Sequence, residues 1–343
     1  DGVLKPPHRN IIINGDMSLA QRATSVTSTG DGYKTCDRWR YERGVGVIDL
    51  SQSTTVPTGQ GFAKSFKVDV TSTASPSAGD VMTIEQRIEG QNLQYLKKGT
   101  SSAESTTLSF WVRSTKTGTY ICELQDVDNS RSISKSYTIS SADTWEKKTI
   151  TFAGDTTGAL DNDNARSLDA IWYLSAGSNY TSGTLQTSWG SKVDANRAVG
   201  QVNFADNTSN DFYLTGCQLE TGTTASDFEF LPVDVNLKRC QRYFEKMLPE
   251  NMVMLRYSGS SSFGRPGNFK VTKRATPTIS REDGTAAIGA YDGDGSGGSS
   301  TASNWALNQA DVEGFSLSAT TPTSPDQFFM AMGGDHFFAE SEL

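Results

Sequence analysis

The sequence lacks the features that mark several common classes of protein. It has only four cysteines and two histidines in 343 residues, and no Cys-x-x-Cys pair. Four widely spaced cysteines are too few for a disulfide scaffold, and the usual ligand spacing of a zinc site is absent. We therefore expect buried thiols at Cys36, Cys122, Cys217 and Cys240, with disulfide bridges as the alternative.

Long apolar runs and an excess of basic residues are also missing. No stretch approaches the ~18–20 apolar residues that cross a membrane, so we expect no membrane insertion. The formal net charge is −8, with 31 Lys and Arg against 39 Asp and Glu. An acidic balance without a basic stripe argues against a nucleic-acid partner. The first seven residues have no signal-peptide core and no initiator Met, so we expect a missing upstream segment.

Hydroxyl-bearing residues and glycine dominate the chain, and hydrophobic residues make up only 35% of it. This composition favours strands and turns over long helices. Apolar side chains alternate with polar ones, as in half-buried strands, and a polar, poorly periodic excursion covers residues 176–210. The pattern predicts an all-β fold, a jelly-roll-like antiparallel β-sandwich over residues 8–232. Its strands are expected at residues 62–70, 81–88, 108–112, 120–124, 133–139, 145–152, 170–174 and 212–219.

A short helix is predicted after the sandwich, as a connector over residues 233–249. Asn236 is a natural N-cap, and Pro249 would stop the helix. Cys240, Phe244 and Met247 recur at helical spacing and are candidates for contacts with another domain or subunit. Residues 250–343 are then expected to form a smaller C-terminal β knob. Its predicted strands are residues 251–257, 269–272, 315–318 and 327–332.

Two local motifs near the start and end of the sandwich have structural interpretations. Asn14-Gly15 is expected to supply the positive φ angles of a tight turn, and Gly222 those of a turn after the last strand. Trp39 is expected to pack while Asp37 pairs with an arginine. A sugar-facing Trp39 is the alternative.

Three groups of segments resemble a known family. Residues 9–17 read RNIIINGDM and are followed by AQR at 20–22 and DRW at 37–39. Residues 214–222 read LTGCQLETG and are followed by FEF at 228–230 and CQRYFEK at 240–246. The chain ends with FAESEL. In order and spacing, these segments resemble receptor-binding tail fibres of tailed bacteriophages, particularly short-tailed marine phages. Leu231 departs from the family's Arg before Pro232, and the ending has Glu-Ser for Asp-Ala.

The resemblance implies a carbohydrate-binding-module-like sandwich with a distal knob, in a homotrimer on the virion. The protein would be made in the host cytoplasm and act outside the cell as a non-enzymatic adhesin for a host surface glycan. Other tail proteins would bind the missing N-terminal segment. A head or tail decoration protein without a receptor role is the alternative, and a polysaccharide depolymerase is a further one.

Catalytic and metal sites find little support in the residues. A catalytic triad needs a histidine oriented by a carboxylate, and His8 and His336 lie near opposite ends of the chain. Asp292 and Asp294 begin an EF-hand-like loop, but Ser303 stands where the twelfth-position acid is required. Carboxylate pairs such as Glu85 and Glu89 are inevitable among 39 acids. We predict no catalytic residue and no cofactor, with a structural calcium left open and without a location.

Aromatic faces flanked by polar side chains are the candidate glycan contacts. Each has packing under a long loop as its alternative. In the resembled fibres the distal tip contacts the receptor, which favours residues 291–308 over the sandwich loops. The candidates are Tyr180, Trp189 and Arg197 in the excursion, and Tyr291, Asp292, Asn304, Trp305 and Asn308 in the distal domain.

Overall fold

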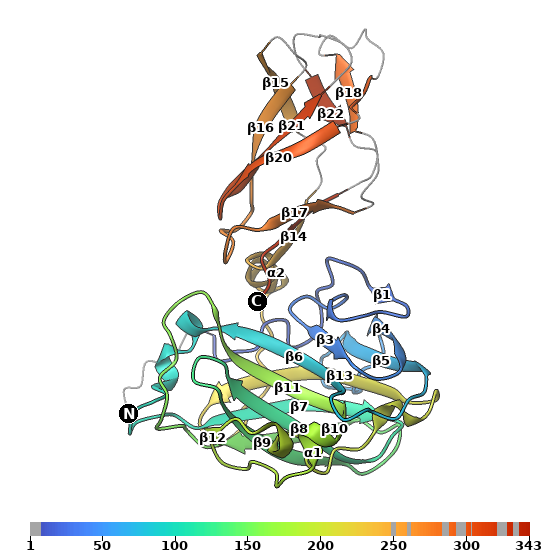
Figure 1. Ribbon diagram of the computed structural model, residues 1–343, viewed down its shortest axis with the longest axis vertical. Helices are drawn as coiled ribbons and strands as arrows, with labels where there is room; N and C mark the ends of the chain where they lie inside the picture. Colours follow the sequence, from blue (N-terminus) through green and yellow to red (C-terminus); the bar gives the residue numbers. More distant parts are fainter. Residues whose placement is uncertain are drawn as a thin grey trace. The chain divides into compact units, whose positions relative to one another are not determined.

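The computed structural model describes residues 8–247, 252–258, 262–282, 288–292, 300–302, 304–320, 328–331 and 336–343 (Figure 1). The chain divides into two compact units, one ending at Asn236 and the other running from Leu237 to Glu342. Among the described residues, no helix is long and apolar enough to cross a membrane.

The first unit is built from strands, with short helical turns between them. Its helix is α1 (Ser178–Thr181), and its 3₁₀ turns are η1 (Gly90–Asn92), η2 (Gln94–Leu96), η3 (Asp194–Asn196) and η4 (Phe204–Asp206). The strands are β1 (Ser25–Val26), β2 (Gly32–Tyr33), β3 (Arg40–Arg43), β4 (Val47–Ser53), β5 (Ser65–Ser72), β6 (Val81–Glu89), β7 (Thr106–Ser114), β8 (Gly118–Asp126), β9 (Arg131–Ile139), β10 (Glu146–Phe152), β11 (Arg166–Ala176), β12 (Gly190–Ser191) and β13 (Asp211–Thr221).

These strands form the predicted jelly-roll-like sandwich of two antiparallel sheets. The six-stranded sheet has the order β1-β4-β5-β13-β7-β10, and the seven-stranded sheet has the order β12-β9-β8-β11-β6-β3-β2. Every predicted strand of the sandwich matches an observed one, although Phe62 lies before β5. Strands β1 to β4 and β12 were not predicted, although Ile48 and Leu50 of β4 are buried and alternate with partly exposed neighbours, as in a half-buried strand.

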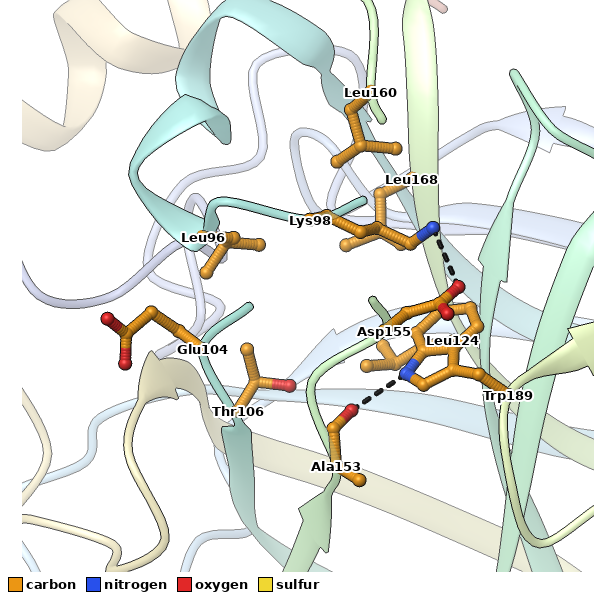
Figure 2. Close-up of a pocket in the computed structure, with 10 residues that line it drawn as sticks. All are labelled: Leu96, Lys98, Glu104, Thr106, Leu124, Ala153, Asp155, Leu160, Leu168 and Trp189. Carbon is orange, nitrogen blue, oxygen red and sulfur yellow. Dashed lines mark hydrogen bonds and ion pairs between the residues drawn. The ribbon is translucent and has the colours of Figure 1, made fainter. Parts of the chain in front are cut away.

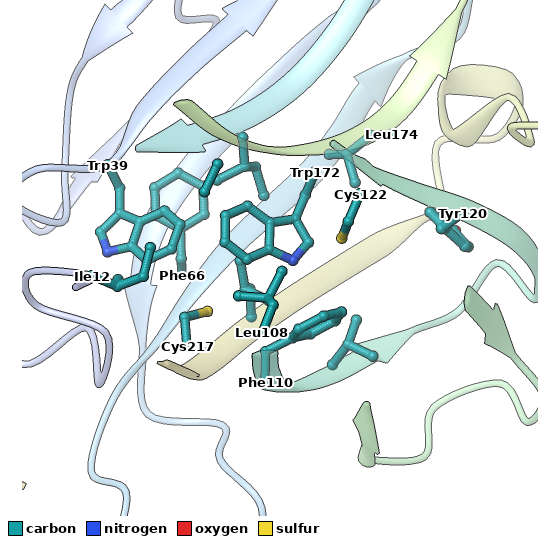
Figure 3. Close-up of a cluster of buried hydrophobic side chains, with 14 of the residues drawn as sticks. Ile12, Trp39, Phe66, Leu108, Phe110, Tyr120, Cys122, Trp172, Leu174 and Cys217 are labelled. Atoms are coloured by element: carbon teal, nitrogen blue, oxygen red, sulfur yellow. The ribbon is translucent and has the colours of Figure 1, made fainter. Parts of the chain in front are cut away.

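Aromatic rings from both sheets fill the core between them (Figure 3). The centroid of Trp172 lies 5.4 Å from that of Trp39 and 5.8 Å from that of Phe110. Trp39 is fully buried and donates its Nε1–H to the Asn14 carbonyl at 2.9 Å, which rules out the sugar-facing alternative. The Asp37 carboxylate accepts hydrogen bonds from the backbone and side chain of Gln21. All four cysteines are buried thiols, as predicted.

The Asn14-Gly15 turn differs from its prediction. Asn14 has the positive φ, 56°, and Gly15 does not. Gly15 is required for a different reason: a Cβ there would lie 2.1 Å from the Cys217 carbonyl oxygen. Asn14 tolerates the left-handed region because its side chain bonds the Leu19 and Asp37 carbonyls. Gly222 has φ +106°, as predicted.

The predicted connector helix begins at the expected residue, but it ends earlier than predicted and Asn236 is not its N-cap. Helix α2 spans Val233–Gln241 and starts before Asn236, because the N–H groups of Val235 and Asn236 both donate to the Pro232 carbonyl. The Asn236 side chain instead accepts from the Asn14 N–H. Phe244 and Met247 lie on strand β14 (Phe244–Met247), which pairs with β23 (Phe337–Glu340). Pairing with this distant strand overrides the helical spacing, and Cys240 alone of the three lies on the helix.

The second unit is also antiparallel β. Strand β23 pairs with β14 and β17 in a three-stranded sheet, and a seven-stranded sheet has the order β19-β18-β22-β15-β16-β21-β20. Residues 269–272 form no strand, contrary to prediction. The remaining strands are β15 (Met252–Ser258), β16 (Ser262–Asn268), β17 (Thr278–Arg281), β18 (Ile288–Asp292), β19 (Ser300–Ala302), β20 (Asn304–Ala310), β21 (Gly314–Thr320) and β22 (Phe328–Ala331).

Candidate functional site

A polar groove lies on the outer face of the seven-stranded sheet of the first unit. Strand alternation builds it, since successive side chains point to opposite faces. On β6, Ile84 and Ile88 enter the core, while Thr83, Glu85 and Arg87 line the groove. The cavity volume is about 210 Å³. The polar groove is lined by Glu42, Val81, Thr83, Glu85, Arg87, Gln125, Arg166, Ile171, Tyr173, Tyr180 and Arg197.

Ion pairs fix the charged side chains at one end of the polar groove. Arg40 binds Glu85 at 2.7 Å and Glu42 at 2.9 Å, and Arg87 binds Glu85 at 2.9 Å. Burial acts to lower the pKa of Arg40, but the two glutamates outweigh it and raise that pKa. The Arg40 guanidinium therefore remains charged, and carboxylates on β3 and β6 hold it in place.

A second ion pair lies on β11, between Arg166 and Asp169. The Arg166 Nε donates to Asp169 Oδ1 at 2.8 Å. The Asp169 side chain is completely buried, and this burial raises its pKa even though Arg166 acts to lower it. The same carboxylate raises the pKa of Arg166 against the opposing effect of burial. The pair therefore gives Arg166, which lines the polar groove, a buried carboxylate as its partner.

At the other end of the polar groove, Arg197 reaches back from the excursion onto β8. Its guanidinium binds Glu123 at 3.0 Å and donates to the Gln125 side-chain oxygen at 2.8 Å. Burial acts to lower the pKa of Arg197, but Glu123 outweighs this effect and raises that pKa. The Tyr173 hydroxyl donates to the same glutamate at 2.8 Å, and burial keeps the pKa of that phenol well above its usual value. The Tyr180 ring centroid lies 5.7 Å from the Arg197 guanidinium.

One hydroxyl in the polar groove has no protein partner among the described residues. Thr83 is 3% exposed and its Oγ1 makes no hydrogen bond there. Buried hydroxyls normally have partners, because an unpaired one costs about 1–3 kcal/mol. Thr83 and Gln125 were missed from the sequence, and Glu85 was set aside as one acid among many. The sequence signal that could have indicated them is the set of polar residues that alternate with core residues along each strand and therefore face outward.

Trp189 lies in a different pocket (Figure 2). That cavity has a volume of about 20 Å³, enough for about one water. The Trp189 Nε1–H donates to the Ala153 carbonyl at 2.8 Å, and the Lys98 Nζ lies 4.9 Å from the ring centroid. Lys98 also binds Asp155 at 2.9 Å. The structure thus brings Tyr180 and Arg197 together and separates Trp189 from both.

The distal candidates lie on strands rather than in loops. Tyr291 and Asp292 end β18, and Asn304, Trp305 and Asn308 lie on β20. In the strand order of their sheet, β22, β15, β16 and β21 stand between these two strands. Residues 293–299, which include Asp294 of the EF-hand-like loop, are outside the described residues. Within the described part of the chain, no group of three or more His, Cys, Asp or Glu side chains is arranged to hold a metal ion.

No protein-family model matches the sequence, and no curated protein matches it either. Solved structures similar to the chain include the enzymatically active domain of tailspike protein 4 of bacteriophage CBA120. The identity is 13% over 63% of this chain and 22% of the tailspike chain, with a TM-score of 0.35. This chain thus spans about a fifth of that tailspike.

Two further similar structures are matched over their whole length. A putative sugar binding protein from Bacteroides thetaiotaomicron is 12% identical over 62% of this chain and all of its own length, with a TM-score of 0.36. A family 61 carbohydrate-binding module in complex with β-1,4-galactotriose is 8% identical over 63% of this chain and 100% of its own length, with a TM-score of 0.33. At such scores no residue-by-residue correspondence follows, and the fold class stands on the chain's own strand order.

Proposed function

We propose that this chain is a non-enzymatic adhesin that binds a surface glycan in the polar groove of its sandwich unit. The observation that carries the proposal is the polar groove itself, where paired arginines and carboxylates surround the unpartnered hydroxyl of Thr83. A sugar hydroxyl both donates and accepts hydrogen bonds, so it is matched by guanidinium donors set beside carboxylate acceptors. Tyr180 supplies one aromatic ring for contact with sugar C–H groups.

Preorganisation supports binding at this surface. The ion pairs hold Arg40, Arg87 and Arg197 in place before any ligand arrives. A ligand then meets side chains that have already lost their conformational freedom, which lowers the entropic cost of binding. The carboxylates are engaged by arginines, and their remaining oxygen lone pairs can accept hydrogen bonds from sugar hydroxyls.

We propose that the chain is part of a phage tail fibre on the virion and forms a homotrimer. Other tail proteins would bind an upstream segment of the same protein. This part of the proposal is supported by the resemblance of residues 9–39, 214–246 and 338–343 to such fibres. Three copies would bind one cell surface together, and avidity can exceed single-site affinity by ~10²–10⁴. The host glycan would then be engaged reversibly and strongly.

Binding to immobilised bacterial surface polysaccharides, with the molar mass of the same sample measured by light scattering, tests the proposal. Tyr180→Ala should weaken binding several-fold and leave the melting temperature close to that of the parent protein. Trp145→Ala is the matched control, because Trp145 is a half-buried aromatic residue beside the other sheet. A folded protein that binds no polysaccharide and no cells would overturn the adhesin. Release of polysaccharide fragments would show a depolymerase instead.

A further inference from the structure

The charge pairing of the polar groove points to its class of ligand. We infer that the polar groove selects a neutral saccharide unit over one carrying a carboxylate, sulfate or phosphate. The inference rests on the proposed function and adds to it the chemistry of the ligand.

Each of the three arginines that line the polar groove (Arg87, Arg166 and Arg197), and Arg40 beside it, already has a carboxylate of the protein as its partner. The pairs are Arg40 with Glu85 and Glu42, Arg87 with Glu85, Arg166 with Asp169, and Arg197 with Glu123 and, at 3.5 Å, Asp194. The four guanidinium groups therefore meet at least as many carboxylates. A site for an anionic sugar needs cations in excess, and this groove offers none.

An anionic sugar would also have to compete with buried carboxylates. The side chains of Glu123 and Asp169 are completely buried, and that of Glu85 is 4% exposed. Moving an arginine from such a partner to a ligand leaves a buried charge uncompensated, which is strongly unfavourable. A hydroxyl group makes no such demand, because it bonds the unused N–H groups and oxygen lone pairs without breaking the pairs.

Thr83 is the residue that we assign to reading a ligand hydroxyl. It is almost completely buried, lines the polar groove, and its Oγ1 has no hydrogen-bond partner among the described residues. Thr83 is the third residue of β6 (Val81–Glu89), and a threonine hydroxyl can donate to or accept from a sugar hydroxyl. The cavity of about 210 Å³ is smaller than the ~300–1,000 Å³ of pockets for drug-sized ligands, which suits a short saccharide unit.

The test compares neutral oligosaccharides of glucose, galactose, mannose and xylose with oligogalacturonate and oligoalginate, using isothermal titration calorimetry on the full chain. We expect binding by a neutral oligosaccharide, with an affinity that changes little between about 0.05 and 0.5 M salt. Tighter binding of an acidic oligosaccharide, weakened by salt, would overturn the neutral class and leave the adhesin standing. Binding of none of these probes, nor of the immobilised polysaccharides, would count against the proposed function itself.

Thr83→Val separates recognition from stability. Loss of one neutral hydrogen bond should weaken neutral-sugar binding about 2- to 10-fold. The melting temperature should not fall, because the free protein loses no hydrogen bond of that hydroxyl, and Thr83→Ser should retain most of the affinity. The matched control is Ser134→Ala, which removes another buried, unpartnered hydroxyl outside the polar groove. Equal affinities for Thr83→Val and the parent protein would overturn the role of Thr83.

Discussion

The guanidinium of Arg197 binds the carboxylate of Glu123 through three N–O contacts of 3.0 to 3.1 Å. Glu123 comes from β8, and Arg197 comes from the excursion between β11 and β13. The Glu123 side chain is completely buried and that of Arg197 is 12% exposed. The pair thus fixes the excursion on the sheet and holds Arg197 in the wall of the polar groove.

Removing Arg197 should be costly. Arg197→Met leaves the Glu123 charge buried without its cation, and breaking such a pair costs about 3–5 kcal/mol. We expect this loss in the free energy of unfolding, measured by urea denaturation at neutral pH. Neutral-sugar binding should fall as well.

Two variants make the Arg197 result interpretable. Lys97→Met removes one partner of the exposed Lys97–Glu104 pair and should change stability by about 0–1 kcal/mol. Arg197→Met combined with Glu123→Leu removes both charges and should recover much of the lost stability. If Arg197→Met were as mild as Lys97→Met, the buried pair would not be stabilising the sheet surface.

Lys98 should give the protein a pH-dependent part of its stability. Its ammonium binds Asp126 and Asp155, and all three side chains are at most 6% exposed. Burial acts to raise the pKa of Asp155, but hydrogen bonds from Arg131, Lys98 and the Thr157 N–H hold it below its usual 3.8. A carboxyl with a lowered pKa stabilises the fold above its unfolded pKa, and that contribution is lost as the pH falls through the folded value.

Lys98→Met should therefore destabilise the protein by about 3–5 kcal/mol at pH 7. The difference from the parent protein should narrow below about pH 3.8, the usual pKa of aspartate, as the carboxylates take up protons. Urea denaturation at a series of pH values measures both effects. A difference that stays constant into acid would contradict the electrostatic account and leave side-chain packing as the cause.

Gly15 should tolerate no side chain. A Cβ at this position would lie 2.1 Å from the Cys217 carbonyl oxygen, so Gly15→Ala forces the first segment away from β13. Overpacking of this kind costs about 1–3 kcal/mol, to be measured as a drop in melting temperature. Gly30→Ala is the matched control, because no atom lies within 4 Å of its Cβ position. A Gly15→Ala protein as stable as Gly30→Ala would contradict this close approach.

The thiols should be inert in the folded protein. Burial raises the pKa of Cys36, Cys122 and Cys217, so at pH 8 these thiols stay protonated, while an unfolded cysteine with pKa about 8.5 ionises in part. Ellman's reagent should react slowly with the native chain. In guanidinium chloride it should titrate all four cysteines. Rapid reaction in native buffer, with the chain still folded, would contradict their burial.

The alternation of apolar and polar residues predicted the sandwich strands well because it reflects which side chains are buried. Alternation around Ile84, Phe110 and Phe212 marks side chains that enter one core, and the same chemistry predicted the buried thiols. The predictions failed where a distant partner decides the local conformation. Phe244 and Met247 follow helical spacing, yet hydrogen bonding to Phe337–Glu340 places them on a strand. Asn236 resembles an N-cap, but the helix begins at Val233, and the Pro232 carbonyl accepts its first hydrogen bonds.

By itself, the sequence determined that this chain is an antiparallel β protein with a core of aromatic and aliphatic residues, since hydrophobic periodicity is a local property. Only the tertiary structure decided where a ligand can bind. Thr83 and Gln125 are far apart in the chain, and antiparallel pairing of β6 with β11 and of β11 with β8 brings them to one groove, where Arg197 is held by its ion pair with Glu123 of β8. An outward-facing polar residue gives the same sequence pattern whether its side chain contacts water or a ligand. The neighbouring strands, which are distant in the sequence, decide which of the two it contacts.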